Sequence, residues 1–395
     1  MKTYCKKIQL NIETVMPWVL NCVGRHWRRY DFEKLLKEHG YIDDDTYITA
    51  VRNIAEDAIN RIKNRDLNID PPQIREKLDA TTGKIRMIGK ESAMQQVFDY
   101  IAVYGCMDIF RARMVGEQAS SIPDRGQIYG KEMIQRWVKK DNDAKRYAER
   151  HGYHYQPKFV YFCKLDIKKC YPSADTDVFL KLFRKDCGNT DLMWLWEQLI
   201  HSHRIGDYKG FLIGALPSQW ASQYMISYIY RFARNQGKVR RNKFVPAIRH
   251  MLMFMDDMLI VGSNRNQLKK AIERTIAYTK NELGWEIKPS WHIREFAKFN
   301  IDMMGYVIRA DGSCTIRSRD FIRIRRMWLR CHDSMTIQQA ARIMSYKGFC
   351  DHSDSRKIIQ KYNVRKIWKA ASKIISERDK NNGNCKSSLR MSEAK

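Results

Sequence analysis

The 395-residue sequence lacks the features of a secreted or membrane-embedded chain. No segment approaches the roughly 20 consecutive apolar residues of a membrane-spanning helix. Residues 1–13 lack the continuous apolar core of a signal peptide. The ten cysteines form no Cys-x-x-Cys pair, which favours reduced thiols over a disulfide framework. We therefore expect a cytoplasmic protein with no membrane partner.

Acidic residues are too few to balance the basic ones. The sequence has 72 Lys and Arg residues against 44 Asp and Glu residues, a formal net charge of +28. A surplus of this size favours a polyanionic partner, with nucleic acid as the first choice and an anionic membrane surface as the alternative. Hydrophobic residues make up 44% of the chain, enough to bury a core, so a wholly disordered chain is not expected.

Helical and strand patterns interleave along the chain, which predicts the α+β class. Hydrophobic spacing predicts a helix over 47–67, ended by Pro71-Pro72, and another over 91–114. Between them, two short basic strands are expected on either side of a Thr82-Gly83 turn. Further helices are expected at 131–150, 175–183, 191–201, 218–233, 267–283, 318–330, 336–345 and 354–376, and further strands at 159–165, 250–255, 258–262, 286–289 and 303–309.

The adjacent carboxylates Asp256 and Asp257 are the strongest chemical signal, because they separate two apolar runs. One interpretation is an ordinary hairpin turn that faces water. The other is a metal site on a hairpin, since Mg²⁺ prefers oxygen ligands and usually takes one or two carboxylates plus substrate phosphates. Two-metal phosphoryl transfer needs a further carboxylate from another strand.

Asp166 is the candidate for that further carboxylate, since it follows the apolar strand 159–165. Its alternative role is to cap the next helix, for which Ser173 or Asp175 is better suited. Between the two carboxylate segments, a glycine turn leads to Ser218. This segment is either a helix capped by Ser218 or a backbone that approaches a nucleotide closely, which glycine permits.

The order and spacing of these segments resemble those of reverse transcriptases, from about residue 70 to residue 350. Each motif is weak alone, and seven occur in the expected order. The matching segments are Gly83-Lys84-Ile85-Arg86 (fingers hairpin), 123–130 (fingers–palm glycine motif), Asp166 with Tyr171 (motif A), 213–219 (motif B), Phe254-Met255-Asp256-Asp257 (motif C), 283–288 (motif D) and 304–306 (motif E).

This resemblance implies a right-hand polymerase fold with fingers, palm and thumb. The palm would hold an antiparallel sheet with packed helices. The implied parts are an N-terminal helical extension (1–70), fingers with part of the palm (71–158), the palm (159–310), a helical basic thumb (311–378) and a polar, loose tail (379–395).

By the same resemblance, Asp166 and Asp256 would hold two Mg²⁺ ions, with Mn²⁺ as an alternative, and Asp257 would assist. The metals would activate the primer 3′-hydroxyl and stabilise the leaving pyrophosphate. The partners implied are an RNA template, a DNA or RNA primer and dNTPs.

The resemblance also assigns substrate contacts. Lys84 and Arg86 would clamp the triphosphate, although a solvated hairpin face explains them as well. Tyr171 would lie under the sugar and favour dNTPs, unless it is a core residue. Lys288 would help to protonate pyrophosphate, or is an ordinary surface lysine. The motif B residues at the substrate would be Ile213, Gly214, Ser218 and Gln219.

The C-terminal region is rich in cations. Residues 311–395 hold 20 Lys and Arg residues against 8 Asp and Glu residues. A thumb of this charge would bind template–primer phosphates without reading sequence. The arginines expected to do so are Arg317, Arg319, Arg323, Arg325, Arg326 and Arg330.

Motif B indicates a subtype. Many reverse transcriptases carry glutamine before the motif B glycine, where this chain has Ile213. The pattern Ile-Gly-x-x-x-Ser-Gln resembles prokaryotic or phage-encoded diversity-generating retroelement enzymes, which misincorporate at template adenines and bind a basic accessory protein. Isoleucine cannot hydrogen-bond near the nascent pair, so fewer polar contacts would reject mispairs.

Two other functions remain open. One is an antiphage defence-associated reverse transcriptase, of the abortive-infection or unknown-group type, that uses a cognate non-coding RNA. Phe254, where tyrosine is commoner, restrains the assignment to the diversity-generating type. The other is a catalytically dead RNA-binding scaffold, which we would expect to have lost one of the three aspartates.

Overall fold

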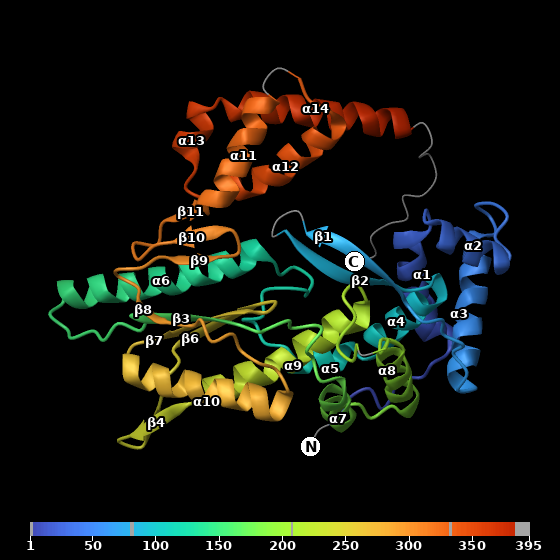
Figure 1. The fold of residues 1–395 in the computed structure, drawn as a ribbon, viewed down its shortest axis with the longest axis horizontal. Coiled ribbons are helices and arrows are strands. Elements are labelled where there is room, and N and C mark those ends of the chain that lie inside the picture. The colour runs from blue at the N-terminus through green and yellow to red at the C-terminus, as the bar shows by residue number, and fades with distance from the viewer. Residues whose placement is uncertain (1–2, 80–82, 207, 332–333, 384–395) are drawn as a thin grey trace. The chain divides into compact units, whose positions relative to one another are not determined.

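The computed structural model describes residues 3–79, 83–206, 208–331 and 334–383 (Figure 1). The side chains of Asp79, Lys84 and residues 378–383 lie outside this description. The chain forms two compact units. Unit 1 comprises Met1–Pro123 and Cys163–Ile293, and unit 2 comprises Asp124–Phe162 and Arg294–Lys395.

Unit 1 begins with the expected helices, α1 (Ile12–His26), α2 (Tyr30–Glu38) and α3 (Tyr47–Lys63). The helix predicted over 47–67 is confirmed, but its predicted end is wrong. It stops at Lys63 because Arg65 and Asn68 adopt left-handed backbone, with φ of 57° and 46°. The chain therefore leaves the helix before it reaches Pro71-Pro72.

The two basic strands are confirmed as the hairpin of β1 (Gln73–Asp79) and β2 (Lys84–Lys90). They pair antiparallel, from Gln73 opposite Lys90 to Asp79 opposite Lys84. Gly83 takes the positive φ of 69° that the turn needs. Thr82, the other expected turn residue, lies outside the described residues. The helix expected over 91–114 is two helices, α4 (Ala93–Gly105) and α5 (Met107–Arg113).

A four-stranded sheet follows the order β6-β7-β3-β8. Its strands are β3 (Tyr161–Asp166), β6 (His250–Phe254), β7 (Asp257–Gly262) and β8 (Ile293–Glu295). The hairpin β6–β7 closes with Phe254 opposite Asp257. The strand expected at 286–289 is wrong, since only one bridge forms there, between Ile167 and Ile287.

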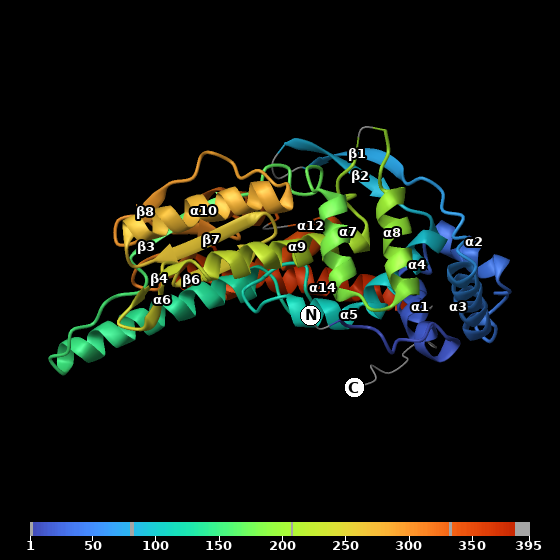
Figure 2. The same ribbon diagram turned by 90° about the horizontal axis from the view of Figure 1, so that it is seen from below.

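The remaining helices of unit 1 pack around a large aromatic core. They are α7 (Thr176–Asp186), α8 (Thr190–Ser202), α9 (Leu216–Arg234) and α10 (Arg265–Leu283). Figure 2 shows α7 and α8 side by side, and α9 contacts α10. Ring contacts join α5, α7, α8 and α9 through Phe110, Phe179, Phe183, Trp196 and Tyr224.

One further element of unit 1 was not expected from the sequence. A second hairpin follows α9, formed by β4 (Gly237–Arg240) and β5 (Lys243–Pro246). Its register pairs Gly237 with Pro246 and Arg240 with Lys243.

Unit 2 contains α6 (Gln127–Arg150) and the sheet β11-β10-β9. The strands are β9 (Ile301–Met303), β10 (Tyr306–Ile308) and β11 (Cys314–Ile316). The C-terminal helices are α11 (Ser318–Arg330), α12 (Ile337–Asp351), α13 (Arg356–Lys361) and α14 (Val364–Gly383). They bury a core that includes Trp328 and Trp368.

Two helix predictions in unit 2 are wrong in extent. The single helix expected over 354–376 is broken at Asn363, whose φ is 48°. The segment expected as a loose tail from residue 379 is helical as far as Gly383, and residues 384–395 lie outside the described part. The mixture of helices and sheets confirms the α+β class. No helix within the described residues combines the length and apolarity that crossing a bilayer requires.

A buried polar cluster begins at the residue that follows β2. Glu91 follows that strand, and its Oε1 is 3.0 Å from His203 Nε2. Asp99 on α4 is only 1% exposed. Burial, followed by the negative charge of Glu91, raises the pKa of Asp99 well above its ordinary value. Asp99 is therefore protonated in the folded chain at pH values where it ionises in the unfolded chain.

We predict that Asp99→Asn flattens the pH dependence of stability. Because the folded pKa is raised, the native state holds more protons than the unfolded state, so wild-type stability falls as pH rises through this interval. Asparagine cannot ionise, so the melting temperature should fall less between mildly acidic and alkaline pH. Thermal unfolding across pH, with the exposed Asp45→Asn as control, measures this. An unchanged pH slope would show that Asp99 is ionised in the fold.

Candidate active site

Backbone hydrogen bonds hold the predicted carboxylate segments together. Asp166 ends β3, and the next amide, Ile167 N, donates to Asp256 O at 3.1 Å. On the other side, Lys288 N donates to Asp166 O at 2.9 Å. The end of β3 is thus fixed between the Asp256-Asp257 turn and the segment after α10. The structure therefore brings together Asp166, Asp256 and Lys288 as the sequence predicted.

The turn that carries Asp256 is supported by a residue that the sequence analysis missed. Met255 adopts left-handed backbone, with φ of 54°. Its amide donates to Ser120 Oγ at 2.6 Å, and Gln223 Nε2 donates to the same oxygen at 3.3 Å. Segment 117–120 lies beside β6, where Ala119 N donates to Met253 O at 2.8 Å. No motif in a single sequence marks Ser120.

Burial raises the pKa of both aspartates of the turn. For Asp256, the negative charge of Asp166 raises the pKa further, while the positive charges of Lys288 and Arg86 lower it. For Asp257, Lys164 lowers the pKa and Asp256 raises it. Both side chains of the turn are half-buried, so they are only partly exposed to water.

Asp166 has one paired and one unpaired oxygen. Oδ2 accepts a hydrogen bond from Lys288 Nζ at 2.7 Å, so Lys288 is no isolated surface lysine. Oδ1 is buried without a hydrogen-bond partner among the described residues. Asp166 does not cap α7, because Asp175 accepts from Asp177 N and Val178 N, each at 3.0 Å. The capping alternative for Asp166 is wrong.

These carboxylates fit a hard cation that also binds substrate. Carboxylate oxygens are the ligands that a divalent cation such as Mg²⁺ prefers, and Asp166 Oδ1 has no hydrogen-bond partner among the described residues. In the part of the chain that the structure describes, no group of three or more His, Cys, Asp or Glu side chains is arranged to hold a metal by itself. Mg²⁺ sites commonly complete their coordination with substrate phosphates and water, so fewer protein ligands are needed.

The motif B turn packs against the hairpin β1–β2. Gly89 N donates to Ile213 O at 2.9 Å. Gly214 has φ of 112°, and a Cβ added there would lie 2.9 Å from Gly89 O. Glycine is therefore required at this turn for both conformation and space. The backbone that Gly214 approaches closely is thus that of Gly89 in β2.

Tyr171 lies on the other side of this turn. Phe211 N donates to Tyr171 O at 2.8 Å, and Ser222 Oγ lies 3.4 Å from the Tyr171 hydroxyl. A Cβ added to Gly210 would lie 2.3 Å from Tyr171 O. Burial raises the pKa of Tyr171. The structure therefore brings motif A and motif B into direct contact through Tyr171.

Ser218 and Gln219 occupy the first turn of α9, but Ser218 does not cap it. The N-cap is Ala215, and no side chain bonds to the helix start. Ser218 is fully buried, with Oγ 3.4 Å from His203 Nδ1. The capping prediction is wrong because Pro217 already lies inside the helix. Gln219 is half-buried, and its carbonyl accepts from Ser222 Oγ at 2.9 Å.

The two predicted hairpin cations differ in what the structure shows. Arg86 on β2 is exposed, and its positive charge lowers the pKa of Asp256, which places the guanidinium within electrostatic reach of that carboxylate. The side chain of Lys84 lies outside the described residues.

The six predicted thumb arginines belong to unit 2. Arg319, Arg325, Arg326 and Arg330 are exposed on α11. Arg323 is half-buried, and Arg317 pairs with Asp302 and lies 4.0 Å from Asp320. Arg317 is thus engaged within unit 2, and the guanidinium of Arg325 lies 5.4 Å from the centre of the Tyr362 ring.

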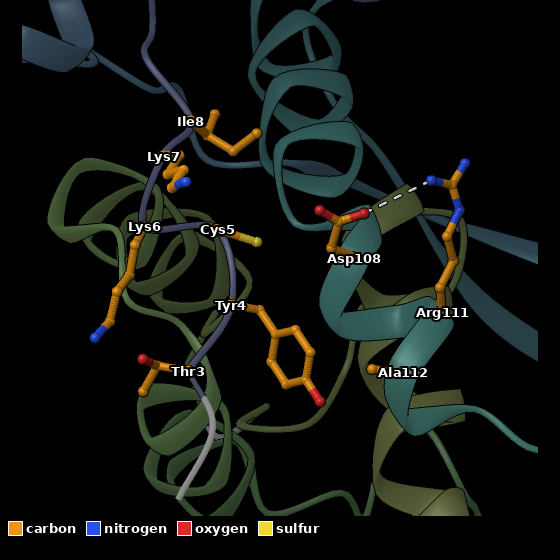
Figure 3. A pocket seen from close by; sticks show the side chains of 9 residues that line it. All are labelled: Thr3, Tyr4, Cys5, Lys6, Lys7, Ile8, Asp108, Arg111 and Ala112. Atoms are coloured by element: carbon orange, nitrogen blue, oxygen red, sulfur yellow. Dashed lines mark ion pairs between the residues drawn. The ribbon is translucent and has the colours of Figure 1, made fainter.

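A cavity of about 720 Å³ lies elsewhere in unit 1 (Figure 3). It is lined by residues 3–8 of the N-terminal segment and by Asp108, Arg111 and Ala112 of α5. Asp108 and Arg111 form an ion pair of 3.6 Å on its wall (Figure 3). None of the predicted site residues lines this cavity.

Comparison with models of known protein families and with curated proteins finds no match. Among solved structures, the chain is similar to apo telomerase from Candida tropicalis, with a TM-score of 0.43 and 12% identity over 95% of this chain and 80% of that one. It is also similar to telomerase from Candida albicans in complex with a fragment of telomeric RNA, with a TM-score of 0.40 and 11% identity over 78% and 67% of the respective chains.

We predict that Gly214→Ala destabilises the chain. The substitution forces a Cβ against Gly89 O in left-handed backbone, at a cost of roughly 1–3 kcal/mol. The matched control is Gly24→Ala in α1, where a Cβ meets nothing within 4 Å and helix propensity should raise stability. Denaturant unfolding of both variants measures the difference. Equal stability of Gly214→Ala and wild type would contradict the close approach to β2.

Proposed function

We propose that this chain is an RNA-directed DNA polymerase, a reverse transcriptase that extends a primer on an RNA template. One observation carries the proposal: the hydrogen bond from Ile167 N to Asp256 O, which joins the end of β3 to the Asp256-Asp257 turn. The ordered reverse-transcriptase motifs supply the candidate chemistry, and the unpaired Asp166 oxygen supports a cation there.

Asp166, Asp256 and Asp257 would hold the catalytic Mg²⁺, for which Mn²⁺ could substitute. Two such ions, when bound, supply Lewis-acid activation of the primer 3′-hydroxyl and neutralise the pyrophosphate charge. The protein's own part is to hold the carboxylates next to one another. Lys288 Nζ, which donates to Asp166 Oδ2 at 2.7 Å, would help to protonate the leaving pyrophosphate.

The incoming nucleotide would bind beside this centre. Arg86, already within electrostatic reach of Asp256, would bind the triphosphate, with Lys84 as its companion on the hairpin. Tyr171 would lie under the sugar and disfavour a 2′-hydroxyl. The main chain at Ile213 and Gly214 would border the nascent base pair. The exposed arginines of α11 would bind template–primer phosphates.

Of the possible subtypes, we favour a diversity-generating polymerase that is error-prone at template adenines. The supporting observation is Ile213, an apolar side chain on a turn held by Gly89. Without a polar group there, a mispair leaves no hydrogen bond unsatisfied. Such an enzyme would act in the cytoplasm of a prokaryote or on behalf of a phage, together with an accessory protein. The second candidate, a defence-associated enzyme with a cognate non-coding RNA, rests on Phe254.

We predict that Asp256→Asn abolishes DNA synthesis. Asparagine keeps the shape but removes the charge that attracts Mg²⁺, so the rate should fall by roughly 100- to 1,000-fold. Primer extension with dNTPs on an RNA template, with and without Mg²⁺, measures this. The exposed Asp45→Asn serves as control and should remain active.

The products of the same reaction separate the subtypes. Errors concentrated opposite template adenines would support the diversity-generating assignment, and uniform fidelity would favour the defence-associated one. Equal synthesis by Asp256→Asn and wild type would contradict the metal site. Absence of synthesis by wild type, even with its neighbouring RNA and proteins supplied, would favour the catalytically dead scaffold.

A further inference from the structure

The hairpin β4–β5 has four cations in six residues and no acidic residue. Lys238, Arg240, Arg241 and Lys243 are all exposed. Within the described part of the chain, no hydrogen bond or ion pair is recorded for any of these four side chains. Arg240 stands directly opposite Lys243 in the register, and directly opposed like charges destabilise a strand pair. An anionic ligand would remove this repulsion.

The opposite face of the hairpin carries an exposed aromatic ring. Side chains alternate between faces along a strand, so Lys238, Arg240 and Lys243 share one face. Val239 and Phe244 share the other face, directly opposite each other, and are 71% and 53% exposed. Together they form a small exposed apolar surface against which a planar ring can pack.

Phe244 is held in position by the hairpin itself. A Cβ added to Gly237 would lie 2.6 Å from Phe244 Cζ, so the ring rests on the backbone of Gly237. Arg241 and Asn242 form the tight turn, with φ of 47° and 59°, as a two-residue hairpin turn requires. The ring is therefore a pre-positioned surface that loses little conformational freedom on binding.

The base of the hairpin is anchored to the rest of unit 1. Arg234 Nη1 donates to Ile248 O at 2.5 Å and to Arg249 O at 2.7 Å. Ala247 N donates to Gln236 O at 2.9 Å, and Ile248 is fully buried. Figure 1 shows the hairpin below α10. The hairpin is therefore held between the end of α9 and the start of β6.

We propose that the β4–β5 hairpin is a binding site for single-stranded nucleic acid. A strand that passes around the tip of the hairpin stacks one unpaired base on Phe244 and pairs its phosphates with Arg241 at the turn and with the three cations on the opposite face. Aromatic stacking combined with a basic surface is how proteins bind single strands without reading sequence. The apolar face has only two side chains, too few to anchor the chain in a bilayer. The site does not depend on the proposed polymerase activity.

The first test measures the contribution of the cations. Fluorescence anisotropy follows binding of full-length protein to a labelled oligo(U) of about 20 nucleotides between about 50 and 200 mM salt. Replacing Lys238, Arg240, Arg241 and Lys243 by glutamine should weaken binding at least tenfold and reduce the salt slope by about 3, since each single-strand phosphate contact contributes about 0.7. The matched control replaces four exposed α10 cations, Lys269, Lys270, Arg274 and Lys280. Equal losses in both variants would show that net charge alone binds RNA and would overturn the site.

The second test isolates the ring. Phe244→Leu keeps an apolar side chain but removes the stacking surface, so affinity for oligo(U) should fall roughly tenfold with an unchanged salt slope. Wild-type affinity in this variant would overturn the stacking. A base-paired RNA of the same length, bound as tightly as oligo(U), would contradict recognition of unpaired bases.

A third measurement separates nucleic acid from an acidic protein. If the glutamine variant keeps its affinity for oligo(U) but loses binding to poly-L-glutamate, the hairpin recognises acidic polypeptides and the proposal is wrong. Circular dichroism and thermal unfolding confirm that each variant is folded. The hairpin is exposed, so these substitutions should leave the melting temperature close to that of wild type.

Discussion

The candidate site depends on one constraint, the proximity of two carboxylates in a partly buried place. A single backbone hydrogen bond, from Ile167 N to Asp256 O, fixes Asp166 beside the Asp256-Asp257 turn. Burial raises the pKa of Asp256, and the negative charge of Asp166 raises it further. The positive charges of Lys288 and Arg86 act in the opposite direction. A cation bound between the carboxylates would relieve their mutual repulsion.

Close backbone packing around glycines sets the second half of the site. Gly89, Gly210 and Gly214 each leave out a Cβ where another main chain or side chain passes. This packing joins the hairpin β1–β2 to the motif B turn, and the motif B turn to Tyr171. The segments that carry the predicted substrate contacts are thus joined to one another by close backbone packing.

Much of this framework was predictable from the sequence, because the signals were local. The β6–β7 hairpin followed from two apolar runs around Asp256-Asp257, and Asp166 from the strand that ends in an acid. The contributions of Ser120, His203 and Glu91 could not be predicted, since each depends on contacts between distant segments. Helix ends were misjudged where non-glycine residues adopt left-handed backbone, as at Arg65 and Asn363.

The β4–β5 hairpin shows a different reason for a missed prediction. Its strands are four residues each, too short for an alternating pattern to stand out. The turn uses Arg241 and Asn242, whereas the usual sequence signal for such a turn is Asn-Gly or Asp-Gly. The charged residues alone resembled an ordinary solvated loop. Only the register reveals that the cations and the ring occupy opposite faces.

The contact between Gly89 and the motif B turn also restricts how the β1–β2 hairpin can move. The base of β2 is bonded to Ile213, and Leu212 fills the space beside Gly89. The strands beyond Gly89, which lead to the exposed pair Leu78 and Ile85, lie outside this contact. Arg86 lies between the two regions, three residues before Gly89, so the short segment of β2 that joins them sets its distance from the motif B turn.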